Sequence, residues 1–190
     1  MVLYGIILNS REITLQEAME KKNIDKLENV SILIDKKNYK LELYSGDVLV
    51  KKYKAVMGRK KSKIKMAPND LVTPAGVYKI CRVNQHKDFY KFFEINYPNL
   101  DDASECYKNG NISKALYEKV IFHLKKGKCP PSDLFDKYKI GIHGIGKYDL
   151  IFRNLPFTFN WTNGSIAISN KNIDELSSVI KVGTVVTIKN

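Results

Sequence analysis

The chain contains little cysteine: Cys81, Cys106 and Cys129 are spread over 190 residues without a Cys-x-x-Cys pair. This spacing excludes a zinc ribbon and a dense disulfide framework. The odd number leaves at least one free thiol in a monomer. No apolar run approaches the roughly 18 residues that a membrane-spanning helix needs. We therefore expect no membrane span, and no cluster of ligands indicates a metal.

Acidic residues are also scarce relative to basic ones. The 32 lysines and arginines outnumber the 20 aspartates and glutamates, which gives a formal net charge of +12. Such an excess favours a polyanionic partner, whether nucleic acid, an acidic membrane surface or an anionic wall polymer. Net charge does not choose among these three. Hydrophobic residues make up 44% of the chain, so a packed core is feasible and extensive disorder is excluded.

The N-terminal region lacks the features of a signal peptide. Its apolar stretch, Val2 to Leu8, has no Lys or Arg before it and no small-x-small cleavage site after it. We interpret this stretch as a strand or packing segment. In the following segment Thr14 precedes Glu17 by three residues, which is a capping-box pattern. The sequence predicts a short helix within 14–29, outside the main core, in an N-terminal extension formed by residues 1–29.

Residues 30–190 are expected to form one mainly β domain with a few peripheral helices. Aliphatic and β-branched residues at strand-like spacing, separated by turn residues, predict a series of strands. The expected strands are 30–35, 40–44, 48–53, one entered through 73–78, 92–95, 140–143, 166–168 and 184–189. Apolar residues on one helical face predict a helix over 112–126, ended by Gly127 and the following Cys-Pro-Pro, and a shorter helix over 173–180.

Histidine is another scarce residue, and its three members are the natural candidates for a general base. We interpret His123 as a partly exposed helix residue and His86 as a solvated residue of a polar loop. His143 differs, because it ends an alternating strand and precedes Gly144. A strand end with glycines, which let backbone or ligand approach, is where β folds place functional sites. A purely structural role for His143 stays open at this point.

A second cluster, Asn160 to Ile168 (NWTNGSIAI), contains the only tryptophan, Trp161. Gly164 precedes Ser165, a nucleophile-type side chain at the start of an apolar strand. A glycine at this place allows a tight turn and lets backbone N–H groups point at a developing oxyanion. The alternative interpretation is an ordinary Gly-Ser turn that leads into a core strand.

Together the two clusters resemble the YkuD-type L,D-transpeptidases, which cross-link bacterial peptidoglycan. That family has a His-Gly at a strand end and, further along the chain, Thr or Ser, any residue, Gly, Cys and an apolar strand. Here Ile142-His143-Gly144 matches the first half and Thr162-Asn163-Gly164-Ser165 the second. Three further segments match, namely 73–78 (TPAGVY), 96–99 (NYPN) with Asp102, and 173–188. The resemblance covers Val30 to Ile188 and implies the family's β-sandwich-like fold.

One position departs from the family pattern, because Ser165 occupies the place of the nucleophilic cysteine and none of the three cysteines fits the motif. The family's chemistry needs a thiolate, and a neighbouring imidazole lowers the thiol pKa below its usual value of about 8.5. A serine hydroxyl is far harder to deprotonate. Ser165 is therefore either an engineered replacement that gives an inactive enzyme or the natural residue of a degenerate member. Both alternatives stay open.

The resemblance implies a mechanism in which His143 is the base for a nucleophile at position 165. The nucleophile attacks a stem tetrapeptide of peptidoglycan and releases the terminal D-alanine, which leaves an acyl-enzyme. Backbone N–H groups near Gly164 and residue 165 hold the oxyanion, and Gly144 belongs to the same turn region. An amine acceptor then gives a cross-link, whereas water gives L,D-carboxypeptidase activity. No metal or organic cofactor is implied.

The resemblance also implies a substrate groove and a location. The expected groove residues are Trp161, Thr162, Asn163 and Arg153. Arg153 is a candidate contact for the substrate carboxylate, because Ala167 stands where the wider family often has arginine; a solvated loop arginine is the alternative. The family works outside the cytoplasm, in the cell envelope or periplasm, although no signal peptide is visible in this chain.

A different class of function rests on Lys51 to Lys65, which contains eight basic residues and no acid. This stretch resembles a nucleic-acid footprint, but it has few aromatic residues for base stacking and no recognised nucleic-acid motif accompanies it. The plainer interpretation is a solvated strand edge and loop. Attraction to anionic wall polymer is a third interpretation, intermediate between a nucleic-acid site and a surface without a partner. A non-catalytic wall-binding protein follows directly if Ser165 is natural.

Overall fold

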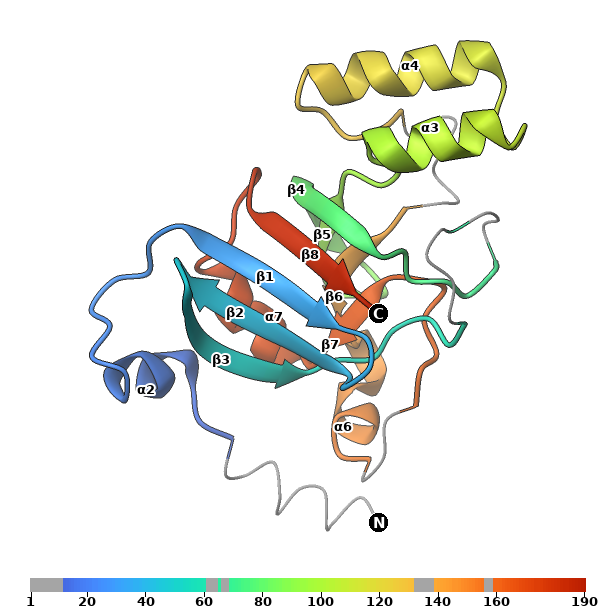
Figure 1. The fold of residues 1–190 in the computed structure, drawn as a ribbon. Helices are drawn as coiled ribbons and strands as arrows, with labels where there is room; N and C mark the ends of the chain where they lie inside the picture. The colour runs from blue at the N-terminus through green and yellow to red at the C-terminus, as the bar shows by residue number, and fades with distance from the viewer. Residues whose placement is uncertain (1–11, 61–64, 66–68, 132–138, 156–158) are drawn as a thin grey trace.

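The computed structural model describes residues 12–60, 65, 69–131, 139–155 and 159–190. The predicted strand or packing segment, Val2 to Leu8, lies outside these residues. Within them, eight strands form one mixed sheet in the order β3-β2-β1-β8-β4-β5-β6-β7 (Figure 1). The pairs β1–β8 and β6–β7 are parallel and the others antiparallel. The strands are β1 (Val30–Asp35), β2 (Lys40–Ser45), β3 (Val48–Lys54), β4 (Gly76–His86), β5 (Tyr90–Ile95), β6 (Gly141–Gly144), β7 (Ile166–Ile168) and β8 (Val185–Lys189).

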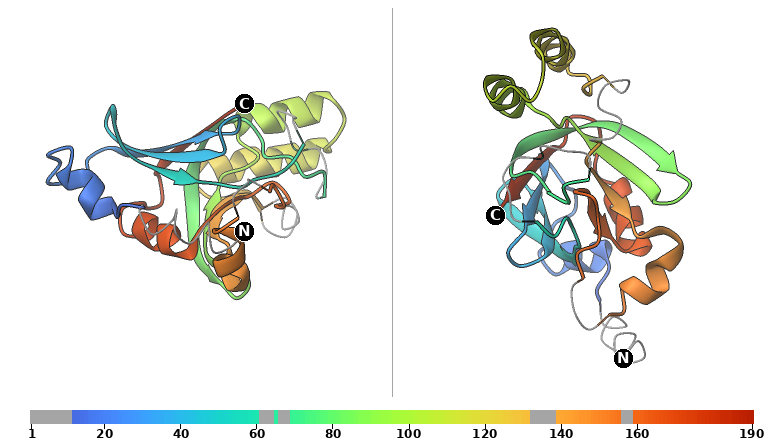
Figure 2. Two further views of the ribbon diagram at one scale, coloured as in Figure 1. Left: turned by 90° about the horizontal axis from the view of Figure 1, so that it is seen from below. Right: turned by 90° about the vertical axis from the view of Figure 1, so that its right-hand side faces the viewer.

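The long strand β4 divides the sheet into two halves that enclose the core. Its first residues, Gly76 to Lys79, pair with β8, and its later residues pair with β5. After β3 the chain passes along the far side of β7, where Val56 and Ala167 form an antiparallel bridge. One apolar cluster takes side chains from both halves, such as Ile32 on β1 and Ile142 on β6. This arrangement confirms the predicted mainly β, sandwich-like fold (Figure 2).

The N-terminal helix α2 (Leu15–Glu20) has the predicted capping box, in which Thr14 and Glu17 each accept from the other's backbone N–H. The helix is shorter than the 14–29 segment and packs on β3. Leu15 is buried and belongs to the main core, so the expectation of a helix outside the core is wrong. The division into an extension of residues 1–29 and a domain of residues 30–190 stays a prediction.

Two helices, α3 (Leu100–Lys108) and α4 (Lys114–Lys125), form a hairpin that stands away from most of the sheet (Figure 1). They pack through Ala103 and Val120, and α4 corresponds to the predicted 112–126 helix. The helix α3 was not predicted from the sequence, and its N-terminus is a reciprocal capping box between Asn99 and Asp102. Two further helices lie near β6 and β7: α6 (Asp149–Phe152) and α7 (Asn170–Ser177), the latter starting earlier than the predicted 173–180 helix.

A disulfide joins Cys81 of β4 to Cys129, which follows α4. The disulfide attaches the chain that follows the α3–α4 hairpin to β4, the strand that ends at His86. Cys106 is a buried free cysteine, which confirms the expectation of one unpaired thiol. The carboxylate of Glu94 lies near the two bonded sulfurs and pairs with Arg82 at 3.4 Å. The two sulfurs are bonded to each other, so this group is a disulfide beside an ion pair.

Two members of the basic stretch, Lys51 and Lys65, are buried, so the interpretation of the stretch as a solvated strand edge and loop does not hold for these two residues. Lys51 is 5% exposed and pairs with Glu175 of α7. A bulge between Leu43 and Tyr44 shifts the β2–β3 register, and the adjacent residues Val50 and Lys51 both become buried. Lys65 is buried as well, while residues 61–64 lie outside the described part. Among the described helices, none has the length and apolar character needed to span a bilayer.

Candidate active site

The parallel strands β6 and β7 bring the two predicted clusters together. Their register pairs Ile142 with Ile166 and His143 with Ala167. Side chains alternate along a strand, so the two isoleucines face the core while His143 and Ala167 share the opposite face. Ser165 precedes Ala167 by two residues, which places it on the His143 side, and its Oγ accepts a hydrogen bond from the N–H of Gly141 at 3.3 Å.

The turn before β7 requires glycine at position 164. Gly164 has a φ of +118°, and a Cβ built there lies 2.3 Å from the carbonyl oxygen of Val72. The hydroxyl of Thr162 donates to the Ser165 carbonyl at 2.6 Å and accepts from the Gly164 N–H at 3.3 Å. Thr162 is therefore buried inside the turn, where it holds the backbone, and its role in a substrate groove stays a prediction. The Gly164 N–H is engaged in the same turn, and an oxyanion role for this backbone stays a proposal.

Lys65 supports this turn from outside. Its ammonium donates to the carbonyl of Asn163 at 2.8 Å and pairs with Asp70 at 2.7 Å. The exposed side chain of Asn163 donates to Asn69 at 2.8 Å. Because Lys65 is one lysine of a long basic run, no signal in the sequence distinguished it as a residue of the site.

His143 is enclosed by aromatic rings. Its side chain is 2% exposed, and the ring centroids of Phe89, Phe92 and Trp161 lie 4.6, 5.8 and 6.1 Å away. Burial lowers the pKa of His143 to about 4, against the smaller opposing effect of its bond to Gly144, so the imidazole is neutral near pH 7.

One hydrogen bond fixes the tautomer of His143. Its Nδ1 lies 2.7 Å from the carbonyl oxygen of Gly144. A carbonyl only accepts, so Nδ1 carries the proton and donates it. Nε2 then holds a lone pair and can act as a base. The absence of a side chain on Gly144 lets α7 approach, because a Cβ there lies 2.6 Å from Asn170 Oδ1.

His86 belongs to the same aromatic cluster, which corrects its interpretation as a solvated loop residue. It is the last residue of β4, and its ring stacks on Phe89 with centroids 4.7 Å apart. Its Nδ1 accepts from the backbone N–H groups of Asp88 and Phe89. These bonds close the β4–β5 hairpin, so His86 holds in place the rings that surround His143.

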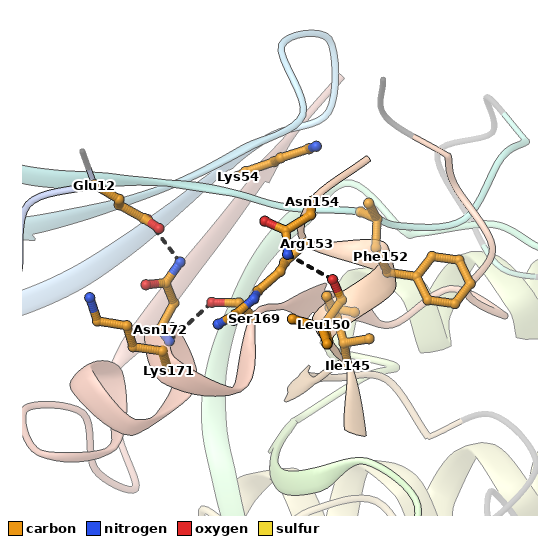
Figure 3. Close-up of a pocket in the computed structure, with 12 residues that line it drawn as sticks. Glu12, Lys54, Ile145, Leu150, Phe152, Arg153, Asn154, Ser169, Lys171 and Asn172 are labelled. Carbon is orange, nitrogen blue, oxygen red and sulfur yellow. Dashed lines mark hydrogen bonds between the residues drawn. The ribbon is translucent and has the colours of Figure 1, made fainter. Parts of the chain in front are cut away.

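A cavity of about 340 Å³ opens beside Ala167 (Figure 3). Arg153, at the end of α6, lines this cavity and pairs with Asp149 at 3.5 Å. Phe152 also lines it and packs against Trp161 at 5.7 Å, which links the cavity wall to the His143 cluster. Thus Arg153 and Trp161 both lie next to the predicted site, and their contact with substrate stays a prediction.

We expect the buried neutral His143 to make stability depend on pH. Its folded pKa of about 4 lies below the ordinary 6.5, so its contribution is complete above pH 6.5 and is lost as pH falls toward 4. The total loss is about 3 kcal/mol. Urea unfolding of the protein and of His143→Gln between pH 7 and pH 4 measures it. The unfolding free energies of the two proteins should converge as pH falls. If they instead change in parallel with pH, the lowered pKa of His143 is contradicted.

Comparison with known proteins identifies the family to which this site and fold correspond. Residues 29–188 match the YkuD family, described as the L,D-transpeptidase catalytic domain. The chain matches no curated protein. Bd1075 of Bdellovibrio bacteriovorus superposes with a TM-score of 0.54 and 21% identity, over 86% of this chain and 48% of its own. The helical cell shape determining protein Pgp2 of Campylobacter jejuni gives 0.51 and 18%, over 93% and 55%.

An L,D-transpeptidase from Mycobacterium smegmatis gives a TM-score of 0.50 and 10% identity, over 85% of this chain and 59% of its own. Identities this low establish the fold alone. This likeness confirms the fold class expected from the sequence. The chain spans about half the length of the first two solved structures.

Proposed function

The chain belongs to the YkuD family of L,D-transpeptidase catalytic domains, and from this premise we propose that it binds peptidoglycan stem peptides at the His143–Ser165 site. Position 165 is then the nucleophile position of an acyl transfer. The observation that carries the proposal is the β6–β7 register, which puts a buried neutral base and residue 165 on one face of the sheet. By family, the site works on the extracytoplasmic cell wall.

The proposed reaction uses the lone pair of His143 Nε2. This atom takes the proton from the nucleophile at position 165, which attacks the carbonyl before the terminal D-alanine of a stem tetrapeptide. The histidine returns the proton to the leaving amine as the acyl-enzyme forms. An amine of a second stem, or water, then attacks the acyl group, giving a cross-link or an L,D-carboxypeptidase product. Backbone N–H groups of the 164–165 turn stabilise the oxyanion, for which the Gly164 N–H gives up its 3.3 Å bond to the Thr162 hydroxyl.

Serine makes this chemistry slow. An imidazole whose pKa is about 4 is a weak base, and a serine hydroxyl is a far weaker acid than a thiol. Proton transfer from the serine to this imidazole is therefore strongly unfavourable. A thiol at the same place forms a thiolate–imidazolium pair that stabilises both charges. We therefore expect the Ser165 form to be nearly inert. The serine at position 165 and the weak basicity of His143 also favour a second candidate function, in which the chain binds stem peptides without turning them over.

Stem-peptide binding is expected to change the fluorescence of Trp161. It is the only tryptophan, and its indole packs against both His143 and the Phe152 wall of the cavity. Titration with a synthetic stem tetrapeptide, with the midpoint checked by calorimetry, measures the effect. A tetrapeptide lacking the D-centres serves as the control ligand. Absence of both heat and fluorescence change would contradict the proposed substrate.

We also propose weak attraction to anionic wall polymer through the exposed part of the basic stretch. Arg59 and Lys60 are exposed, in contrast to the buried Lys51 and Lys65. Replacing both exposed residues by glutamine should weaken binding to peptidoglycan and to duplex DNA alike, and reduce the salt slope by about two. Lys21→Gln with Lys22→Gln is the charge-matched control. Strong preference for one DNA sequence would favour a nucleic-acid function instead.

A further inference from the structure

We propose that a cavity at the β1–β2 turn is a binding site for a phosphate ester of a polyol or sugar. The cavity has a volume of about 360 Å³, near the lower end of the range for small-molecule sites, which is roughly 300–1,000 Å³. The inference rests on the attraction to anionic wall polymer proposed above and deepens it, because it names the chemical group that is recognised and the place where it binds. It does not depend on the reaction at position 165.

The cavity lies where four strands reach the same end of the sheet. Strands β1 and β8 run parallel and finish side by side (Figure 1). Strand β2 begins and β3 ends there as well, because Lys40 pairs with Lys54. Met57 and Gly58, which follow β3, are buried and line the cavity. The wall of the cavity is therefore supported by strand ends and by a buried segment.

Four basic side chains line the cavity, two from each of two segments. Lys36 and Lys37 belong to the β1–β2 turn, and Arg59 and Lys60 follow β3. Among the residues that the structure describes, no acidic side chain lines it. The acid of the turn, Asp35, has both carboxylate oxygens engaged by hydrogen bonds within the turn. Cations that meet around one cavity without a carboxylate between them favour an anion of more than one charge.

Two asparagine amides add hydrogen-bond donors to this lining. The Oδ1 of Asn160 accepts from the N–H of Met57 at 3.1 Å. The Oδ1 of Asn190 accepts from the Lys36 ammonium at 2.8 Å. Both asparagines line the cavity, and with Oδ1 engaged each amide has its NH₂ group to offer to a ligand. The lining side chains are therefore mainly donors, which suits the oxygens of a phosphate and disfavours an amine or a metal cation.

Lys36 is held half-buried by neutral oxygens. Besides Asn190, its ammonium donates to the carbonyl of Thr73 at 2.8 Å. Burial lowers the pKa of Lys36, because a partly desolvated ammonium loses hydration that neutral oxygens replace only in part. A phosphate in the cavity reduces this cost, so the burial of Lys36 and the charge of the lining favour the same ligand.

Tyr39 and the size of the cavity indicate what the phosphate is attached to. The Tyr39 side chain lines the cavity and is 37% exposed, so its ring offers an apolar face to the C–H groups of a ligand. The buried Met57 adds a second apolar surface. A small polyol or sugar presents C–H groups together with hydroxyls that the two amides can bind. A nucleic-acid duplex is too wide to enter such a cavity, so we infer a polyol phosphate of a wall polymer as the source.

The cavity borders the segments that form the candidate active site. Asn160 directly precedes Trp161. Met57 follows Val56, whose bridge to Ala167 joins this part of the chain to β7. A polymer held in the cavity therefore stays close to the segments that present residue 165.

The test measures binding of glycerol 3-phosphate and of the diester glycerophosphoglycerol by calorimetry, with glycerate as the matched ligand that has a carboxylate instead of a phosphate. The unchanged protein should bind a phosphate ester roughly tenfold or more tightly than glycerate. Asn160→Asp should weaken that binding by roughly tenfold or more, because it retains the acceptor for the Met57 N–H and replaces the amide donor by an anion. Asn111→Asp makes the same charge change at an exposed residue outside the cavity, and it should bind as the unchanged protein does.

The two esters identify the source. Binding of the diester supports a polymer, and binding of the monoester alone supports the site with a free polyol phosphate as its ligand. Both aspartate variants are checked by thermal melting. If Asn160→Asp does not fold, Lys37→Gln with Arg59→Gln replaces it, since this pair removes one exposed cation from each segment and should cause the same loss.

Three results overturn the site. They are the absence of binding by both esters, equal binding of the esters and glycerate, and equal weakening by Asn160→Asp and Asn111→Asp, which would mean diffuse attraction. Duplex DNA that binds without either ester, and loses binding only in Asn160→Asp, also overturns it in favour of nucleic acid. None of these results touches the stem-peptide function, which Trp161 reports, or the diffuse attraction, which the paired replacement of Arg59 and Lys60 measures.

Discussion

Ser165→Cys is expected to be acylated by a carbapenem, with a covalent adduct visible by intact mass, while the Ser165 protein takes up almost none. The base, the glycine turn and the register that puts residue 165 on the same face as His143 are already present. Only an ionisable nucleophile is lacking. A thiol beside an imidazole ionises near neutral pH, and the resulting thiolate in turn raises the pKa of the histidine.

His143 is the internal control for this experiment. Adding His143→Ala to the cysteine variant should slow acylation by about 100-fold or more, which is the usual contribution of a positioned base. Cys106, Cys81 and Cys129 are present in all forms, so an adduct in the Ser165 protein would reveal reaction elsewhere. If the folded cysteine variant takes no adduct, the likeness to the family is one of fold only.

Gly164→Ala should destabilise the protein by about 2–5 kcal/mol. A left-handed backbone costs an L-residue roughly 1–2 kcal/mol, and overpacking against a fixed neighbour adds about 1–3 kcal/mol. The neighbour here is the Val72 carbonyl, 2.3 Å from the new Cβ. The turn that presents residue 165 is the part expected to move, so acylation of the cysteine variant should fall together with stability.

Gly183→Ala separates the two costs. Gly183 also has a positive φ, +93°, but a Cβ there meets no atom within 4 Å. It should lose only the backbone part, about 1–2 kcal/mol. The difference in urea unfolding free energy between the two variants measures the contact with Val72. Equal losses would mean that the turn yields, and that the close approach does not constrain position 165.

The strands could be predicted because their alternation is local. Residues 30–35 and 166–168 were predicted with the bounds that the structure shows. The helix α3 was missed because LDDASECYK has too few apolar residues for a helical face, although the Asn99–Asp102 pair is a capping signal. The helix α6 has only four residues, which is too short for a helical repeat of apolar residues to be recognised in the sequence.

Long-range partners are the other part that the sequence does not reveal. Lys51 meets Glu175 across 124 positions, and the bulge that buries it depends on the β2–β3 register. The Cys81–Cys129 pairing, 48 residues apart, is likewise not encoded by spacing. The site itself was proposed from two short motifs, yet the support from Lys65 and the cavity beside Ala167 arise only when the sheet forms.

The most direct test of the account is D-alanine release from a stem tetrapeptide, followed by mass spectrometry. We predict release by Ser165→Cys, little release when His143→Ala is added, and almost none by the unchanged protein. Tetrapeptide that stays intact with the folded cysteine variant, despite binding that Trp161 reports, would contradict an acyl-transfer site at position 165.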